Sequence, residues 1–218
     1  LLAAMLIAAG AGITMGIWAA RRRYSGWSLL LLVASIIGVS LPSFLAALLL
    51  QMGVIELTQT TGHTWLPVGG FGWDLHLVLP AVVLAARPLA QTARITFVTI
   101  SEILEQDYVR TARSKGLKER LVMVKHVFLN AAVPVLTTLS VSLRYSLVSL
   151  PVVEFFFSWP GIGFTLLKGI AKQDDNLTVI LVLALGILFI LLNLLLDLTY
   201  RIIDPQLRRV PEHIASEL

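Results

Sequence analysis

The charged side chains of this sequence are concentrated in one stretch, DYVRTARSKGLKERLVMVKH, which runs from Asp107 to His126. Eight of its twenty residues are charged, and six of the eight are Lys or Arg. Apolar residues recur between the charges, a composition that suits binding to a partner or a membrane surface. The first question is therefore what this basic stretch contacts.

Residues arranged for catalysis are not found in the sequence. It has no G-x-x-x-x-G-K-[ST] phosphate loop. Its four histidines are scattered, with no pair at metal-ligand spacing, and no Ser–His–Asp order is suggested. We therefore expect no catalytic residue, no metal site, no directly bound cofactor and no enzymatic activity. If the protein drives transport, the energy must come from a partner or from an ion gradient.

The basic stretch itself is predicted to form two short helices joined at a sharp elbow. Asp107–Lys115 forms the first, and Gly116 ends it as a C′ glycine would. The second is an amphipathic helix able to lie along a membrane surface. Its apolar face consists of residues spaced by four, three and four positions: Leu117, Leu121, Val124 and Phe128.

The elements that must position this stretch are long and apolar. The chain of 218 residues is 57% hydrophobic and only 14% charged, against about 25% charged in a typical soluble domain. Five apolar blocks each reach the ~20 residues needed to span a bilayer. They are Leu1–Ala20, Ser28–Met52, Leu75–Ile100, Asn130–Phe157 and Leu177–Tyr200.

These blocks predict the fold class. They are continuous and rich in Leu and Ala, whereas the strands of a membrane barrel would alternate in polarity. With no cysteine, the chain has no disulfides or thiolate ligands. We expect an all-α, polytopic membrane protein with five transmembrane helices and one permease domain over residues 1–209. Because the chain begins inside an apolar run without Met, we also expect it to be truncated at the N-terminus, with a sixth helix upstream.

Positive charge predicts the orientation of the spans. Twelve of the 17 Lys and Arg residues lie in Arg21–Arg23, in the basic stretch and in a third group formed by Arg201, Arg208 and Arg209. Five alternating spans place these groups on one side. We therefore expect a cytoplasmic loop at about 101–127, a cytoplasmic tail at 210–218, and outer loops at about 53–74 and 156–176. This topology accounts for the basic composition without a nucleic-acid partner.

Prolines within the spans predict kinked helices of the kind that line a path or pack statically. They are Pro42, Pro80, Pro88, Pro134 and Pro151. In the second outer loop, Pro160-Gly161 is a turn signal flanked by apolar residues. We expect this turn to fold back against the helix bundle.

Four separated segments resemble the permeases of ATP-binding-cassette importers, in particular the dipeptide, oligopeptide and nickel branch. The first is the basic stretch, with Asp107–Leu117, Arg120, Lys125-His126 and Asn130-Ala131. The others are Gly38–Phe44, Val153–Gly163, and Asn193–Tyr200 with Asp204–Arg208. Their order and spacing fit the whole chain and imply the type I importer permease architecture.

The sequence departs from the general permease pattern at several positions. Where the general loop has Glu-Ala-Ala, this chain has Arg110-Thr111-Ala112, as in the peptide branch. The general Ile-x-Leu-Pro is replaced by His126–Leu129. These differences favour the peptide branch over sugar permeases. Arg87 and Arg144 fall where uncharged residues are expected, so we expect a translocation path that differs from that of the commonest members.

The resemblance implies a set of partners. They are a second homologous permease that forms a heterodimer with this chain, two ATPase subunits that bind ATP and Mg²⁺, an extracytoplasmic substrate-binding protein, and the lipid bilayer of a bacterial or archaeal plasma membrane. The elbow would dock on an ATPase. Apolar contact would come from Tyr108, Ala112 and Leu117, charge complementarity from Arg110, Arg113 and Lys115, and the turn from Gly116.

Two further groups of residues are candidates for the translocation path. Trp159, Pro160 and Gly161 are expected to form an outer gate. Arg87 and Arg144 lie deep in the third and fourth blocks, where a charge usually faces a partner or a wet cavity. They either meet the carboxylates of a peptide in transit or pair with Glu154 or with an acid on the partner permease.

The function that follows is that of a permease subunit importing dipeptides or oligopeptides. The same machine could instead carry nickel or another small solute. A gradient-driven secondary transporter and a structural assembly subunit are the alternatives from other classes. Co-purification with an ATPase would distinguish the importer from both.

Overall fold

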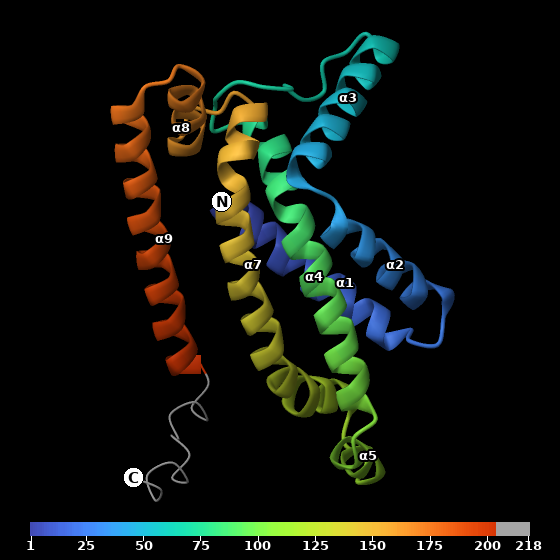
Figure 1. Ribbon diagram of the computed structural model, residues 1–218. Helices are drawn as coiled ribbons and strands as arrows, with labels where there is room; N and C mark the ends of the chain where they lie inside the picture. The colour runs from blue at the N-terminus through green and yellow to red at the C-terminus, as the bar shows by residue number, and fades with distance from the viewer. Residues whose placement is uncertain (204–218) are drawn as a thin grey trace, which may run out of the picture.

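A computed structural model describes residues 1–203, and every regular element in that range is helical. In chain order the elements are α1 (Leu2–Arg21), α2 (Gly26–Ser40), α3 (Ser43–Thr61), η1 (Leu75–Leu77), α4 (Val78–Leu104), α5 (Asp107–Ser114), α6 (Glu119–Leu121), η2 (Val122–Phe128), α7 (Leu129–Phe156), α8 (Ile162–Ala171) and α9 (Asp175–Ile203). Helices α4, α7 and α9 run between two ends of the molecule, with α5 at the lower end and α8 near the upper end, and α1 crosses obliquely behind α4 and α7 (Figure 1).

Five helical segments in this part of the chain are long and apolar enough to cross a membrane, which confirms the predicted number. They are Leu2–Arg21, Ser43–Thr61, Leu75–Leu104, Glu119–Phe156 and Asp175–Leu195. In the last of these segments, no residue of the most apolar stretch is buried inside the protein. This is expected of a surface that faces lipid or another subunit. The all-α, polytopic fold class is confirmed.

The second predicted span is wrong in its boundaries. The block Ser28–Met52 is divided into α2 and α3 by a break at Leu41-Pro42. Leu41 has ψ 119° and Pro42 has ψ 141°, because the proline ring disfavours helical geometry in the preceding residue. The helix that is long enough to span therefore begins at Ser43.

The outer loops also differ from the prediction. Helix α3 continues to Thr61, so the first loop begins at Gly62, which ends the helix with φ +66°. The second loop contains the ten-residue helix α8. The expected cytoplasmic loop is mostly helical too, because α4 reaches Leu104 and the chain is helical again from Glu119.

Helix α1 packs closely on α4 through a row of small residues. Buried small residues recur at every fourth position of α1: Ala4, Ala8, Gly12, Gly16 and Ala20. A Cβ on Gly16 would lie 2.5 Å from Thr96 Cβ and 2.6 Å from the Ala93 carbonyl oxygen. Small residues at this spacing let two helix backbones approach within a membrane. This signal was visible in the sequence but was not used in the prediction.

The described bundle has two apolar clusters, one toward each end. One is built from α1, α2, α4, α5, η2 and α7 and includes Phe97, Ile100 and Leu104. The other joins α1, α3, α4 and α7 around Leu79, Leu84 and Phe157. Each cluster fixes one of the two candidate sites described below.

Candidate functional site

The elbow is attached to the bundle by the inner face of α5. Helix α4 ends at Leu104, and α5 begins three residues later at Asp107, at the lower end of the bundle in Figure 1. Val109 is fully buried and Ala112 is 5% exposed, and both belong to the apolar cluster that contains Ile100. Helix α5 is therefore packed against the end of α4 by close-packed side chains, which do not deform freely.

The turn that follows α5 has the predicted geometry. Gly116 has φ +73°, in the left-handed region where only glycine is unstrained. Its N–H donates to the Arg113 carbonyl oxygen at 2.9 Å, and the Leu117 N–H donates to the Ala112 carbonyl oxygen at 3.3 Å. The second bond is the one expected from a C″ residue to the C3 carbonyl in a Schellman motif. The short helix and its C′ glycine are confirmed.

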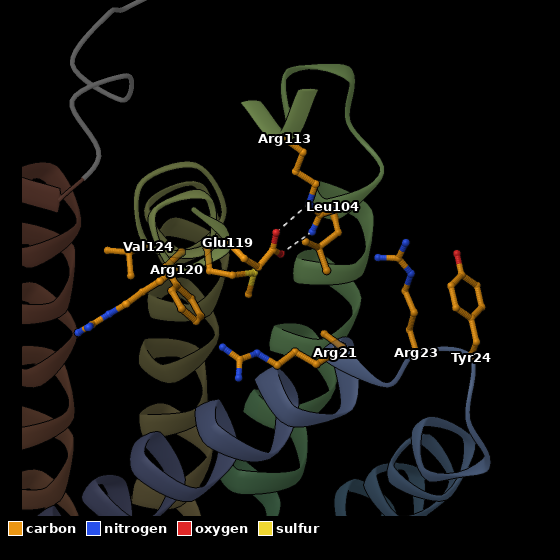
Figure 2. A pocket seen from close by; sticks show the side chains of 11 residues that line it. Arg21, Arg23, Tyr24, Leu104, Arg113, Glu119, Arg120 and Val124 are labelled. Atoms are coloured by element: carbon orange, nitrogen blue, oxygen red, sulfur yellow. Dashed lines mark hydrogen bonds and ion pairs between the residues drawn. The ribbon is translucent and has the colours of Figure 1, made fainter. Parts of the chain in front are cut away.

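An ion pair also bridges the elbow. Arg113 Nε donates to Glu119 Oε2 at 3.1 Å and Arg113 Nη2 to Glu119 Oε1 at 2.7 Å, as the dashed lines in Figure 2 show. These hydrogen bonds raise the pKa of Arg113 above its ordinary value. The two-pronged contact fixes the direction in which the chain leaves α5. Glu119 is a site residue that the sequence analysis missed.

The structure corrects the expected role of Ala112 and adds a second contact for Arg113. Ala112 points into the bundle, so it is not available for apolar contact with a partner. The Arg113 guanidinium is engaged by Glu119, which leaves less of its hydrogen-bonding capacity for a partner. The prediction placed Ala112 on the partner-facing side of α5. An eight-residue helix has two sides that carry apolar residues, and only the packing of the neighbouring helices decides which side is buried.

The outward face of the elbow carries the remaining predicted residues. Tyr108 is 43% exposed and Leu117 is 37% exposed. Arg110 and Lys115 are exposed, and Arg110 forms a surface pair with Asp107 at 3.6 Å. The Tyr108 hydroxyl accepts a hydrogen bond from Asn130 Nδ2 at 3.3 Å, which links this face to the start of α7.

The predicted amphipathic helix after the elbow is not a separate short helix, and part of its apolar face is exposed. The buried residues are Val122, Met123 and Val127, whereas Leu121 and Val124 are exposed. Val122–Phe128 is wound as a π-helix that runs directly into α7. A π-helix has i→i+5 hydrogen bonds, so residues five apart share a face and the 3.6-residue spacing does not apply. The segment is therefore the first part of a long helix, bent at the lower end of α7 in Figure 1.

Two of the three basic groups lie at this end of the molecule. Arg23 Nη2 is 3.9 Å from Glu105 Oε1, between α4 and α5. Arg21 and Arg23 line the same cavity as Arg113. These contacts confirm that the two groups lie on the same side of the bundle. Arg208, Arg209 and the predicted tail 210–218 lie outside the described residues, as does the side chain of Arg201.

At the opposite end of the bundle, aromatic rings from the two loops that were predicted to be outer loops pack together. The centroid of the Trp159 ring lies 4.9 Å from that of Phe71 and 6.3 Å from that of Trp73, and both pairs pack edge to face. The Gln51 amide donates to the carbonyl oxygens of Val68 at 2.7 Å and Phe156 at 3.0 Å. The proposed gate residue Trp159 therefore packs on the first of these loops, and Gln51 ties α3 to that loop and to the end of α7.

The first outer loop also contains an exposed acid–imidazole pair. Asp74 Oδ1 is 2.7 Å from His76 Nδ1 and accepts the His76 backbone N–H at 3.1 Å. The hydrogen bond from the His76 side chain is the main reason why the pKa of Asp74 is below its ordinary value. This contact orders the turn into η1, where Asp74 is the N-cap.

Glu154 caps the helix of the second outer loop. Its Oε2 accepts the backbone N–H of Phe164, in the first turn of α8, at 3.0 Å. A Cβ on Gly161 would overlap the carboxylate, and a Cβ on Gly163 would overlap Pro151. A carboxylate at a helix N-terminus is favourable because it satisfies free N–H groups and faces the positive end of the helix dipole. The predicted folding back of this turn against the bundle is confirmed.

Neither intramembrane arginine is placed to pair with Glu154. The Arg87 guanidinium lies over the Tyr145 ring at 4.6 Å and lines a cavity of ≈ 40 Å³ between α3, α4 and α7. Arg144 is partly buried on α7, ten residues before Glu154, which is about 15 Å along a helix. The expectation of a pair with Glu154 is therefore wrong, because that carboxylate caps α8.

Comparison with known proteins identifies a family. Residues 12–209 match the model of the binding-protein-dependent transport system inner membrane component. A glutathione transport system permease protein of Pectobacterium atrosepticum is 35% identical, with 94% of this chain and 64% of the relative covered. A putative peptide transport system permease protein of Brucella abortus is 37% identical, with 95% and 67% covered.

A third relative leads to the same group. A dipeptide transport system permease protein of Bacillus subtilis is 33% identical, with 94% of this chain and 65% of the relative covered. The chain thus spans about two thirds of the length of these three relatives. The similarity runs through the spans, the elbow and the outer turn alike. This multi-pass membrane protein therefore belongs to the binding-protein-dependent transport system inner membrane component family.

Proposed function

We propose that this chain is the membrane-spanning permease subunit of an ATP-driven importer for dipeptides or oligopeptides. The observation that carries the proposal is the elbow, which is anchored by Val109 and Ala112 on its inner side and exposes Tyr108 and Arg110 on its outer side. Such an element suits the transfer of motion from a separate protein to the spans. The family match supports a transport subunit rather than an enzyme.

The coupling would proceed through packed side chains. An ATPase that binds ATP and Mg²⁺ would dock on the outer face of α5, with Arg110 and Lys115 meeting acidic groups and Tyr108 and Leu117 supplying apolar contact. Displacement of α5 would then move α4 through Val109 and move η2 and α7 through the same cluster. Gly116 and the Arg113–Glu119 pair would keep the two arms of the elbow at a fixed angle.

The remaining partners and the orientation belong to the same proposal. A second, homologous permease would complete the path as a heterodimer, and an extracytoplasmic binding protein would deliver the substrate to the end that holds Trp159, Pro160 and Gly161. The elbow and the C-terminus would lie in the cytoplasm of a bacterial or archaeal cell. The concentration of Arg and Lys at the elbow end supports this orientation.

The names of the relatives support a peptide substrate. The three relatives above are named for the transport of glutathione, peptides and dipeptides. In this chain, the exposed Arg87 over Tyr145 is the group proposed to meet a peptide carboxylate. Arg144, partly buried on α7, is a second candidate for this contact.

Site-directed photocrosslinking tests the docking assignment. These 218 residues contain no cysteine, so Arg110→Cys introduces the one cysteine among them, as an attachment point for benzophenone maleimide on the outer face of α5. We expect this variant to cross-link to an ATPase in the full-length complex. Thr61→Cys, exposed at the end of α3, is the matched control at the opposite end of the bundle.

Two outcomes would refute the docking assignment. One is an Arg110→Cys complex that keeps ATP-dependent uptake but gives no cross-link to any nucleotide-binding subunit. The other is an equal yield of ATPase cross-link from Thr61→Cys, which would place ATPase contact at both ends of the bundle.

A further inference from the structure

A cavity of ≈ 690 Å³ opens beside the elbow, and it is strongly basic. It lies between the end of α1, the α1–α2 link, the end of α4 and the η2 segment, and Figure 2 shows its side chains. The polar groups that line it are Arg21, Arg23, Arg113, Glu119 and Arg120, together with the Tyr24 ring.

The charges in this cavity, which we call the basic pocket, are not balanced by the described residues. Among the described residues, Glu119 is the only acid that lines it, and Arg113 already holds that carboxylate in two hydrogen bonds. Arg23 has one long ion-pair contact with Glu105 and lies over the Tyr24 ring at 4.9 Å, and its buried Nε has no hydrogen-bond partner in the part of the chain described. Arg21 and Arg120 add two further charges, for which the described residues show no ion pair at salt-bridge distance. A bound anion would satisfy these donors.

The other walls of the basic pocket are apolar. Leu104, Met123, Val124 and Phe128 line it, and Val124 is 53% exposed. Contact with these apolar walls would add no binding free energy for a small inorganic anion. A ligand with a phosphate at one end and hydrocarbon at the other would use both surfaces.

The level of the basic pocket in the bundle favours a membrane lipid. Arg21 is the last residue of one candidate span, Leu104 is the last residue of another, and Glu119 is the first of a third. Aromatic residues also lie in and beside the α1–α2 link: Tyr24 in the link is 87% exposed, and Trp18 of α1 packs edge to face on Trp27 of α2 at a centroid distance of 5.6 Å. Aromatic rings of this kind mark the boundary between hydrocarbon and water.

We propose that the basic pocket binds the phosphate head group of an anionic phospholipid, with the start of an acyl chain against Leu104, Met123 and Phe128. The guanidinium groups of Arg21, Arg23 and Arg120 point in different directions (Figure 2). A head group would therefore be held by direct hydrogen bonds from one or two of them, since Arg forks suit phosphate oxygens, and by the positive charge of the rest. Basic pockets between the ends of spans commonly hold such head groups. Because Arg113 and Glu119 line the same cavity, a bound lipid also braces the elbow. This inference requires that the chain spans a membrane but does not depend on the proposed importer function.

The test is native mass spectrometry of the full-length complex in detergent, titrated with dioleoylphosphatidylglycerol. Removing two pocket charges with Arg21→Ala plus Arg120→Ala should weaken this binding about thirty-fold, at ~1 kcal/mol for each basic residue near the surface. The paired variant Arg21→Lys plus Arg120→Lys keeps the charge and should recover much of the affinity. Arg22→Ala is the matched control, because Arg22 lies over the Trp18 ring and does not line the pocket.

Several outcomes would overturn the proposal. An equal loss in Arg22→Ala would mean a diffuse surface charge, and equal binding of dioleoylphosphatidylcholine would mean no recognition of anionic charge. Displacement of the lipid by millimolar inorganic phosphate would assign the site to a free anion. A double alanine variant that keeps lipid binding but loses its co-purifying subunits would identify the pocket as a protein contact. If the double alanine variant keeps both its lipid binding and its co-purifying subunits, Arg21 and Arg120 do not bind the lipid.

Discussion

Gly116→Ala isolates the backbone geometry of the elbow from its contacts. Gly116 has φ +73°, and a Cβ built on it meets no heavy atom within 4 Å. The substitution therefore creates no clash, and any effect must come from the cost of a left-handed conformation. Few positions in the described chain separate these two causes so cleanly.

The expected size of the effect follows from that cost. A residue with a Cβ loses roughly 1–2 kcal/mol in the left-handed region. At 1.36 kcal/mol per factor of ten, the equilibrium between the closed and the open elbow shifts about five- to thirty-fold toward the open state. The open state loses the hydrogen bonds from the Gly116 and Leu117 N–H groups to the carbonyls of Arg113 and Ala112. Exchange of these two amide protons should accelerate by the same factor.

Hydrogen–deuterium exchange of the full-length complex in nanodiscs measures this directly, on peptides that cover residues 105–118. The matched control is Gly53→Ala, because Gly53 lies within α3 and its added Cβ also meets nothing within 4 Å. Gly116→Asn should give a smaller acceleration than Gly116→Ala, since Asn tolerates the left-handed region better. Unchanged exchange in Gly116→Ala, or an equal rise at the elbow in Gly53→Ala, would refute the reasoning.

The outer turn and the intramembrane arginine give two further predictions. In Gly161→Ala the new Cβ overlaps the Glu154 carboxylate. The free energy of unfolding should therefore fall by about 1–3 kcal/mol, the usual cost of overpacking. The measurement is the Tm of the purified complex, which should be lower. That cost should shrink in a Glu154→Ala background, and strict additivity of the two substitutions would contradict the contact. Arg87→Leu should slow dipeptide uptake by about ten-fold or more, for the loss of a charged hydrogen bond worth ~1.5–3 kcal/mol; uptake at the full rate with an intact complex would exclude Arg87 from the path.

Composition and local pattern determined much of this protein. Runs of apolar residues predict membrane helices wherever they lie, because insertion depends on the segment itself. The number of spans, the basic end, the short helix from Asp107 and the turn at Gly116 were predicted on such local grounds and are confirmed. The break at Pro42 was also readable locally, since the residue before a proline avoids helical geometry, but the prediction extended one span across it.

Only the tertiary structure decided which faces are buried and which polar groups meet. Ala112 points inward because Ile100 and Val127 lie against that side of α5, and no pattern within eight residues reveals this. The π-helix changes the residue spacing by which the face after the elbow was assigned. Glu154 and Gln51 bind backbone groups on other elements, as far as 105 residues away. Such contacts depend on how helices pack in space, and sequence neighbours carry no information about that.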